Sequence, residues 1–139
     1  MPITTPHTAL PDLNAAVYSA LTASSAFTNL STGPFAKAPT SQPFPYTTFG
    51  MHQESNWYTF QNTGRQVLFS LNVWSQKSFE EVYAIIDVIT QTLETQTLTL
   101  THFTMAQNDF TFDTAEPQEA QDGVTLYVTA RYRVHLTAK

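Results

Sequence analysis

The sequence predicts an α+β fold: a mainly antiparallel sheet of about four strands, with two helices packed on one face and a protruding β-hairpin. Two segments carry apolar residues at helical spacing, while the other periodic segments alternate apolar with polar residues. Strands joined by turns, with the helices kept apart from them, are typical of α+β folds. Threonine occurs 23 times, and this β-branched residue packs well on a pleated sheet.

One domain is expected over residues 10–139, preceded by a short arm at 1–9. A length of 139 residues suits a single domain, and a content of 42% hydrophobic residues can form a core without disulfide or metal staples. The chain has no cysteine, which excludes thiol catalysis, disulfide bonds and cysteine-ligated zinc.

Helices are expected at about 11–23 and from 79 to about 94. Ser78 and Glu81 have the spacing of a capping box, in which each side chain accepts from the backbone N–H of the other residue. The second helix is expected to pack its apolar side on one face of a strand at 65–76. The two sets of side chains are Val82, Ile85, Ile89 and Leu93 on the helix and Val67, Phe69, Leu71 and Val73 on the strand.

The clearest strands, 65–76 and 126–136, alternate apolar and polar residues throughout. A strand from Pro45 to about residue 53 is expected at an edge of the sheet, because proline has no N–H to donate to a neighbouring strand.

Between the second helix and the last strand the pattern is weaker. Residues 97–105 alternate, with a shift of face that predicts a bulge near Thr101 and His102. In the polar stretch that follows, a short strand is expected at 110–112 and a loop at 116–123.

Three aromatic residues lie in the predicted hairpin at 54–64, which ends in the turn sequence Asn-Thr-Gly. They are Trp57, Tyr58 and Phe60. Either they cover the sheet, or they are exposed and anchor a partner, since aromatic side chains are enriched at the centres of protein interfaces.

The formal net charge is −5, and the charges are unevenly placed. No lysine or arginine occurs between Lys77 and Arg131. This gap disfavours a nucleic-acid-binding domain, because duplex affinity comes mainly from lysine and arginine on phosphates. The nine acids in the gap are Glu80, Glu81, Asp87, Glu94, Asp109, Asp113, Glu116, Glu119 and Asp122.

The acids at 109–122 leave three interpretations open. They could form a solvated loop, an electronegative functional surface or a cation site, although their spacing is not that of a calcium-binding loop. Arg131 and Arg133 form a basic patch with Lys139. These arginines could be solvated, or they could pair with the acids of a neighbouring copy of the chain.

No catalytic, cofactor or metal site is predicted. The four histidines are far apart and lack metal-ligand spacing, and four glycines cannot build a phosphate-binding or dinucleotide-binding loop. Adjacent Glu80 and Glu81 point in different directions on a helix and suit its positive end. A non-enzymatic function without cofactors is expected. The alternative, a small hydrolase-like enzyme, would show a concave pocket with a perturbed carboxylate.

The sequence has no apolar window of about 18 residues and no N-terminal signal pattern, so neither a membrane span nor a signal peptide is expected.

Four segments together resemble the tail-terminator or tail-completion proteins of long-tailed bacteriophages and gene transfer agents. The resemblance runs over residues 13–136, and its most specific parts are the Pro-x-Pro-Tyr sequence followed by Gly50 and the strand end Val-Trp-Ser. None of these is a chemical motif, so the likeness lies in their order and spacing. The four segments are LNAAVYSAL at 13–21, PFPYTTFG at 43–50, LNVWS at 71–75 and VHL at 134–136.

The resemblance implies a ring, usually of six copies, on the head-proximal end of the tail. Such a ring stops polymerisation of the tail-tube protein and meets the head-completion or connector protein, and DNA passes through its hole without specific binding. It also implies a virion location at the head–tail interface, with assembly in the host cytoplasm. A head-side stopper or a tail-tube subunit is the alternative. Partner-specific contacts are expected where the chain departs from the family pattern, at 1–9 and 108–122.

If DNA passes through such a ring, the surface of the hole should be neutral or acidic, because each neutralised phosphate adds affinity that passage must break. The candidates for that surface are Asp109, Asp113, Glu116, Glu119 and Asp122, or the exposed side of the helix at 79–94. Arg131 and Arg133 are instead expected to face outward or to lie at a subunit contact.

Overall fold

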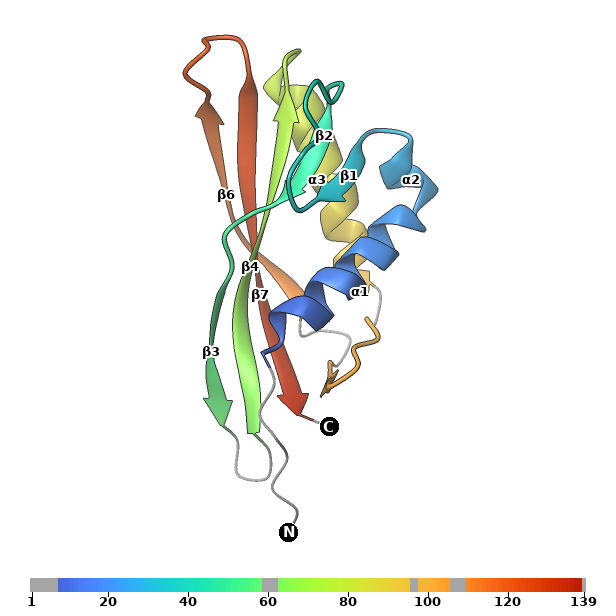
Figure 1. The fold of residues 1–139 in the computed structure, drawn as a ribbon, viewed down its shortest axis with the longest axis vertical. Helices are drawn as coiled ribbons and strands as arrows, with labels where there is room; N and C mark the ends of the chain where they lie inside the picture. The colour runs from blue at the N-terminus through green and yellow to red at the C-terminus, as the bar shows by residue number, and fades with distance from the viewer. Residues whose placement is uncertain (1–7, 59–62, 96–97, 106–109, 139) are drawn as a thin grey trace.

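Three helices and a seven-stranded sheet make up the described part of the chain (Figure 1). The computed structural model describes residues 8–58, 63–95, 98–105 and 110–138. The helices are α1 (Leu10–Thr22), α2 (Ser25–Thr28) and α3 (Phe79–Thr95). The strands are β1 (Thr32–Phe35), β2 (Tyr46–Phe49), β3 (Gln53–Tyr58), β4 (Thr63–Ser75), β5 (Phe103–Thr104), β6 (Phe110–Glu119) and β7 (Leu126–Ala138).

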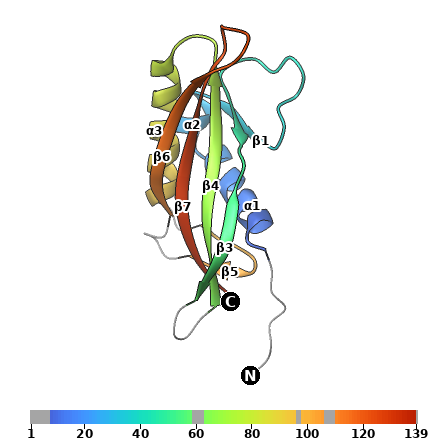
Figure 2. The same cartoon turned by 90° about the vertical axis from the view of Figure 1, so that its left-hand side faces the viewer.

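Strands β4 and β7 form the centre of the sheet. They pair antiparallel along their length, from Gly64 opposite Thr137 to Ser75 opposite Leu126. The strand order is β1-β2-β4-β7-β5, with β3 also pairing with β4 and β6 also pairing with β7. Every pair is antiparallel except β1 with β2. The helices all lie on one face of this sheet, and the other face is open (Figure 2).

The predicted α+β class is confirmed, but the sheet is larger than the four strands expected and a third, short helix is present. The segment predicted as one strand from Pro45 is divided at residues 50–52 into β2 and β3, which both pair with β4. The prediction that this segment begins at a sheet edge is wrong, because β1 lies beyond β2. Pro45 precedes β2, so the ladder does not need an N–H from it.

Two predictions after α3 are only partly right. Within the described residues 98–105, only Phe103 and Thr104 form a strand. The strand predicted at 110–112 is present but longer, and the loop predicted at 116–123 starts only after Glu119, because β6 runs for ten residues to that position. Most of its side chains are exposed on both faces, so the sequence does not alternate there, and its backbone pairing with β7 holds it as a strand.

The predicted contact between α3 and the central sheet is confirmed, since α3 packs on β4, β6 and β7. The α3 side chains Val82, Ile85, Ile89 and Leu93 are at most 1% exposed, and the β4 side chains Val67, Phe69, Leu71 and Val73 are fully buried.

Only one of the two hydrogen bonds of the predicted capping box forms at the start of α3. The Ser78 hydroxyl oxygen accepts from the backbone N–H of Glu81 at 3.2 Å. The Glu81 carboxylate does not complete the predicted capping box, because it accepts from the Ser75 hydroxyl at 2.7 Å. This bond ties the start of the helix to the end of β4, and it lets the chain turn sharply between them.

The carboxylate of Glu54 on β3 fixes the start of α1. It accepts from the backbone N–H of Ala9 at 2.8 Å and from the Thr8 hydroxyl, and it forms an ion pair with Arg65 Nε at 3.2 Å. Ala9 is fully buried. Thr8 and Ala9, which the sequence placed in the arm, are therefore held against the domain, and the remaining arm residues 1–7 lie outside the described part.

His52 fills the gap between β2 and β3. Its Nδ1 accepts from the Ser70 backbone N–H at 3.0 Å, so the ring proton is on Nε2, which lies 3.1 Å from Asn14 Oδ1 on α1. The imidazole stacks on Phe69 with ring centroids 4.1 Å apart. Gly50 allows this close crossing, because a Cβ atom there would lie 2.9 Å from Ser70 Cβ. The His52 imidazole thus accepts the hydrogen bond from the Ser70 N–H that a backbone carbonyl of a neighbouring strand would accept in a regular sheet.

Replacing Ile85 with alanine should lower the free energy of unfolding by about 2–5 kcal/mol, because a fully packed site cannot collapse around the missing atoms. Urea unfolding followed by circular dichroism measures the loss. Gln91→Ala, on the exposed side of the same helix, is the control and should change it by about 0.5 kcal/mol or less. Equal midpoints for the Ile85 variant and the parent chain would contradict the packing.

The protein should lose stability as the pH falls from about 6.5 towards 4. Burial lowers the pKa of His52 to about 4, from 6.5 in the unfolded chain, so the unfolded state binds more protons in this interval. Urea midpoints between pH 7.5 and 4 measure the effect. His52→Asn, which cannot titrate there, should flatten the fall. A variant with the same pH slope as the parent chain would show that His52 is not its source.

Candidate assembly surfaces

The uncovered face of the sheet, which we call the open face, carries the alternate residues of β4 and β7 (Figure 2). The intervening residues of both strands are buried beneath the helices, and successive strand side chains point to opposite faces. Five cross-strand pairs therefore line the open face. They are Trp74 with Tyr127, Asn72 with Thr129, Ser70 with Arg131, Leu68 with Arg133, and Gln66 with His135.

An aromatic row crosses one end of the open face. Tyr46, Trp74 and Tyr127 come from β2, β4 and β7, with ring centroids 6.1 Å and 4.4 Å apart along the row. The indole N–H of Trp74 donates to the Thr48 hydroxyl at 3.0 Å, and the Tyr127 hydroxyl donates to the Gln118 side chain at 2.7 Å. The polar groups of Trp74 and Tyr127 are thus satisfied within the chain, and the half-buried rings of the row form a flat apolar strip.

Ion pairs cover the middle of the open face. Arg131 lies 3.2 Å from Glu116, and Arg133 lies 3.4 Å from Asp113. Both acids are on β6, beside β7, so arginines and acids do not occupy separate surfaces as the sequence suggested. Pairs this exposed contribute little to stability, roughly 0–1 kcal/mol each. Their main effect is to cancel the charge of the basic patch.

The other candidate acids have different surroundings. Glu119 is exposed at the end of β6. The Asp122 carboxylate accepts from the backbone N–H groups of Val124 and Thr125 and from the Thr125 hydroxyl, and these bonds lower its pKa. Asp122 therefore shapes the turn between β6 and β7. Asp109 lies outside the described residues.

The hairpin of β3 and β4 extends beyond the helices at one end of the molecule, as predicted (Figure 1). Trp57 and Tyr58 belong to β3, and their backbones pair with Gly64 and Thr63. The structure describes the backbone of Trp57 and Tyr58 but not their side chains, and Phe60 lies outside the described residues. Their role as partner anchors stays a prediction.

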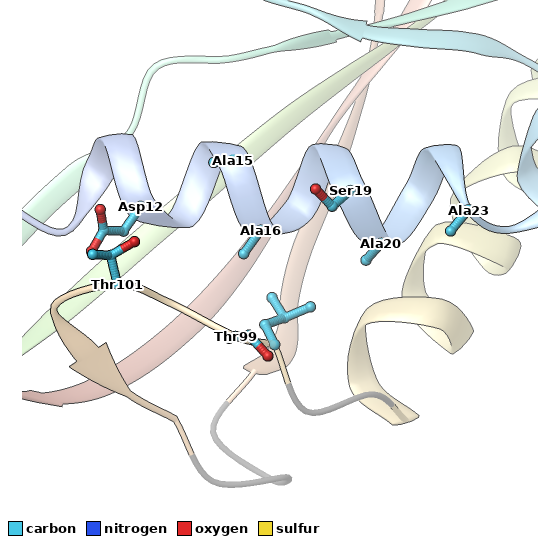
Figure 3. A pocket seen from close by; sticks show the side chains of 9 residues that line it. Asp12, Ala15, Ala16, Ser19, Ala20, Ala23, Thr99 and Thr101 are labelled. Atoms are coloured by element: carbon cyan, nitrogen blue, oxygen red, sulfur yellow. The ribbon is translucent and has the colours of Figure 1, made fainter.

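A cavity of about 410 Å³ lies between α1 and residues 98–101 (Figure 3). Small side chains of α1 and two threonines line it, and Asp12 is the one ionisable residue among the lining residues. The Asp12 carboxylate is already occupied, because it accepts from the backbone N–H of His102 at 2.9 Å and lies 3.0 Å from that residue's Nδ1. No second titratable residue lines the cavity; the titratable partner of Asp12, His102, is not among the lining residues.

The described residues contain no group of three His, Asp or Glu side chains that could hold a metal ion. Every buried side-chain nitrogen or oxygen in them has a hydrogen-bond partner. Burial raises the pKa of Tyr132, whose hydroxyl lies 2.9 Å from the Thr90 hydroxyl beneath α3.

In the part of the chain that the structure describes, no helix is long and apolar enough to cross a membrane.

The sequence model of one protein family, described as tail completion protein gp17, matches residues 15–135. The match runs from α1 into β7 and includes the open face. The chain belongs to this family. Its members are structural proteins of tail completion, in agreement with the resemblance seen in the sequence. No curated protein sequence matches the chain.

Solved structures that share the fold include a chain from the virion of a native gene transfer agent particle. The two chains superpose with a TM-score of 0.79 at 16% sequence identity, and the match covers 95% of this chain and 99% of that one. At this identity the likeness concerns the fold. It covers the whole arrangement of sheet and helices.

The aromatic row was not predicted from the sequence. Trp74 alternates with Val67, Phe69, Leu71 and Val73 and so falls on the other side of its strand, but this alternation does not tell which strands lie beside it. The available signal was that Trp74 and Tyr127 are both outward-facing aromatics in the two longest alternating strands.

Proposed function

We propose that copies of the chain form a closed ring, of six, that caps the head-proximal end of a tail tube. Each copy contributes a single domain, residues 10–139 with the arm 1–9, and the ring lies at the head–tail interface of a virion assembled in the host cytoplasm. It ends tube polymerisation and joins the tail to the head connector. The family match over residues 15–135 is the observation that carries the proposal, because it spans nearly every element of the fold.

The arrangement of charge supports passage of DNA through such a ring. All three arginines of the chain are in ion pairs: Arg65 with Glu54, Arg131 with Glu116 and Arg133 with Asp113. In each pair the carboxylate offsets the positive charge of the guanidinium, which weakens its attraction for a phosphate group. The open face is therefore suited to line a hole that does not bind DNA tightly, since nonspecific affinity grows with each neutralised phosphate. This proposal departs from the expectation that Arg131 and Arg133 face outward, because Asp113 and Glu116, which were expected at the surface of the hole, pair with them on the same face.

The protruding hairpin is suited to reach a neighbouring subunit or the tail tube. Its two strands extend past the helices, and Glu54 and Arg65 brace its base against the start of α1. Trp57, Tyr58 and Phe60 are the proposed anchors, because aromatic side chains beside a polar turn are costly to leave in water.

A head-side stopper or a tail-tube subunit is the second candidate. A tube subunit stacks into long tubes by itself, whereas a terminator stops at closed rings. The fold is compatible with either kind of contact, so the assembly state of the chain distinguishes these two roles.

Mass measurement of the purified chain, alone and mixed with tail tubes, tests the proposal. We expect closed rings of a fixed number of copies, and tubes whose growth stops when the chain is added. Trp57→Ala should lose ring formation or capping while its circular dichroism melting curve stays unchanged. Long polymers of the chain alone would favour a tube subunit. Tubes that continue to grow in its presence would reject the terminator role.

The chain should not bind duplex DNA tightly at physiological salt, because its arginines are neutralised within the chain. Fluorescence anisotropy with a labelled duplex measures this. Glu116→Gln frees Arg131 and should raise the affinity in a salt-sensitive way. Glu119→Gln removes the same charge from the same strand without freeing an arginine, and it should change affinity less. Tight binding by the parent chain, or equal gains in both variants, would contradict the argument.

A further inference from the structure

Four of the large exposed hydrophobic side chains lie on two opposite flanks of the molecule. Tyr83 on α3 is 47% exposed and Phe112 on β6 is 43% exposed, whereas Tyr18 on α1 is 50% exposed and Leu30, just before β1, is 41% exposed. The sheet order places β1 and β6 on opposite sides of the central pair β4 and β7. Helix α1 contacts β1 and helix α3 contacts β6. In Figure 2 both helices lie behind the sheet, with α3 displaced towards the β6 edge and α1 towards the opposite edge.

The first of these surfaces, the β6 flank, consists of Tyr83 and Phe112, the free edge of β6, and the exposed acids Glu80, Asp87 and Glu119. Tyr83 and Thr90 are seven residues apart, about two helical turns, so they share one side of α3. Thr90 contacts the Tyr132 hydroxyl at 2.9 Å, and the Tyr132 ring contacts the Phe112 ring at 5.8 Å between centroids. This side of α3 therefore faces β6. Within the described residues, β6 pairs only with β7, so its outer edge is unpartnered.

The second surface, the β1 flank, consists of Tyr18, Leu30 and Lys37. All three side chains are exposed, and Leu30 lies two residues before β1 and Lys37 two residues after it. Lys37 is the only lysine, arginine or acid between Asp12 and Glu54. The β1 flank thus combines two exposed hydrophobic side chains with a single positive charge, that of Lys37.

The β6 flank is acidic by comparison. Glu80 and Asp87 are exposed on α3, and Glu119 is exposed on β6. No ion pair among the described residues involves any of the three. Two β6 flanks brought together would repel each other, which disfavours a symmetric dimer through this surface. Docking of the acidic β6 flank on the β1 flank, which carries Lys37, does not bring like charges together.

We infer that the β6 flank of one copy docks on the β1 flank of the next copy. The contact puts Tyr83 and Phe112 of one copy against the exposed Tyr18 and Leu30 surface of its neighbour, which removes four large apolar side chains from water. It joins two different surfaces, so each copy keeps one of each for the next neighbour. A contact of this head-to-tail kind closes into a ring when its rotation allows. The inference rests on the ring proposed above and names the surfaces that build it.

Two single substitutions test this contact. Tyr83→Glu blocks the β6 flank, and Tyr18→Glu blocks the β1 flank; both residues are exposed, so the melting temperature should stay close to that of the parent chain. Each variant alone should lose rings and run as a 15.6 kDa monomer in native mass spectrometry. An equimolar mixture should give one-to-one dimers of twice that mass, because each pair retains one intact contact.

Val124→Glu is the matched control. Val124 is 57% exposed in the turn between β6 and β7 and is not one of the residues that define either flank, so this variant should form rings like the parent chain. Rings that persist in either flank variant, a flank variant that dimerises alone, or a mixture that stays monomeric would overturn the contact while leaving the ring. A parent chain that stays monomeric, alone and on tail tubes, would overturn the ring and the contact together.

Discussion

The long antiparallel pairing of β4 with β7 is the constraint on which the rest of the structure depends. Its register runs without a break from Gly64 opposite Thr137 to Ser75 opposite Leu126. Every other strand except β1 is attached directly to one of these two strands, and β1 is attached through β2. The same register decides which side chains enter the core under α3 and which form the open face, because a shift by one residue would exchange the two sets. Fold and assembly surfaces are thus set by one ladder.

The middle of the open face is polar, and its polar groups pair with one another. Thr129 donates to Asn72 at 2.7 Å, and Arg131 lies 3.2 Å from Glu116. Groups already paired have little to gain from a passing phosphate or a wrong partner. The exposed apolar side chains lie mostly elsewhere, on the flanks, so the face and the flanks suit different tasks in an assembly. This division supports a structural role more than a catalytic one.

Much of this could be read from the sequence, since α3 and the two central strands have strong periodicities that report directly on burial. The edge strand β6 could not be found that way, because residues such as Thr111 and Glu116 are exposed and carry no alternating signal. One signal for this strand was available. If the chain forms a hairpin that turns near Gly123, paired residues have residue numbers with a nearly constant sum, so Glu116 lies opposite Thr129 and close to Arg131. The role of His52 was also hidden, because it depends on the interruption between β2 and β3, which local sequence does not specify.

The outer edge of β6 has three features that oppose the addition of another strand. The register shifts between Phe112 and Thr114, Pro117 has no N–H to offer, and Asp113, Glu116 and Glu119 carry negative charge. Sheet growth from this edge is therefore blocked even though the edge is long. A contact on this side of the molecule would have to be made by side chains and not by an extended β-ladder.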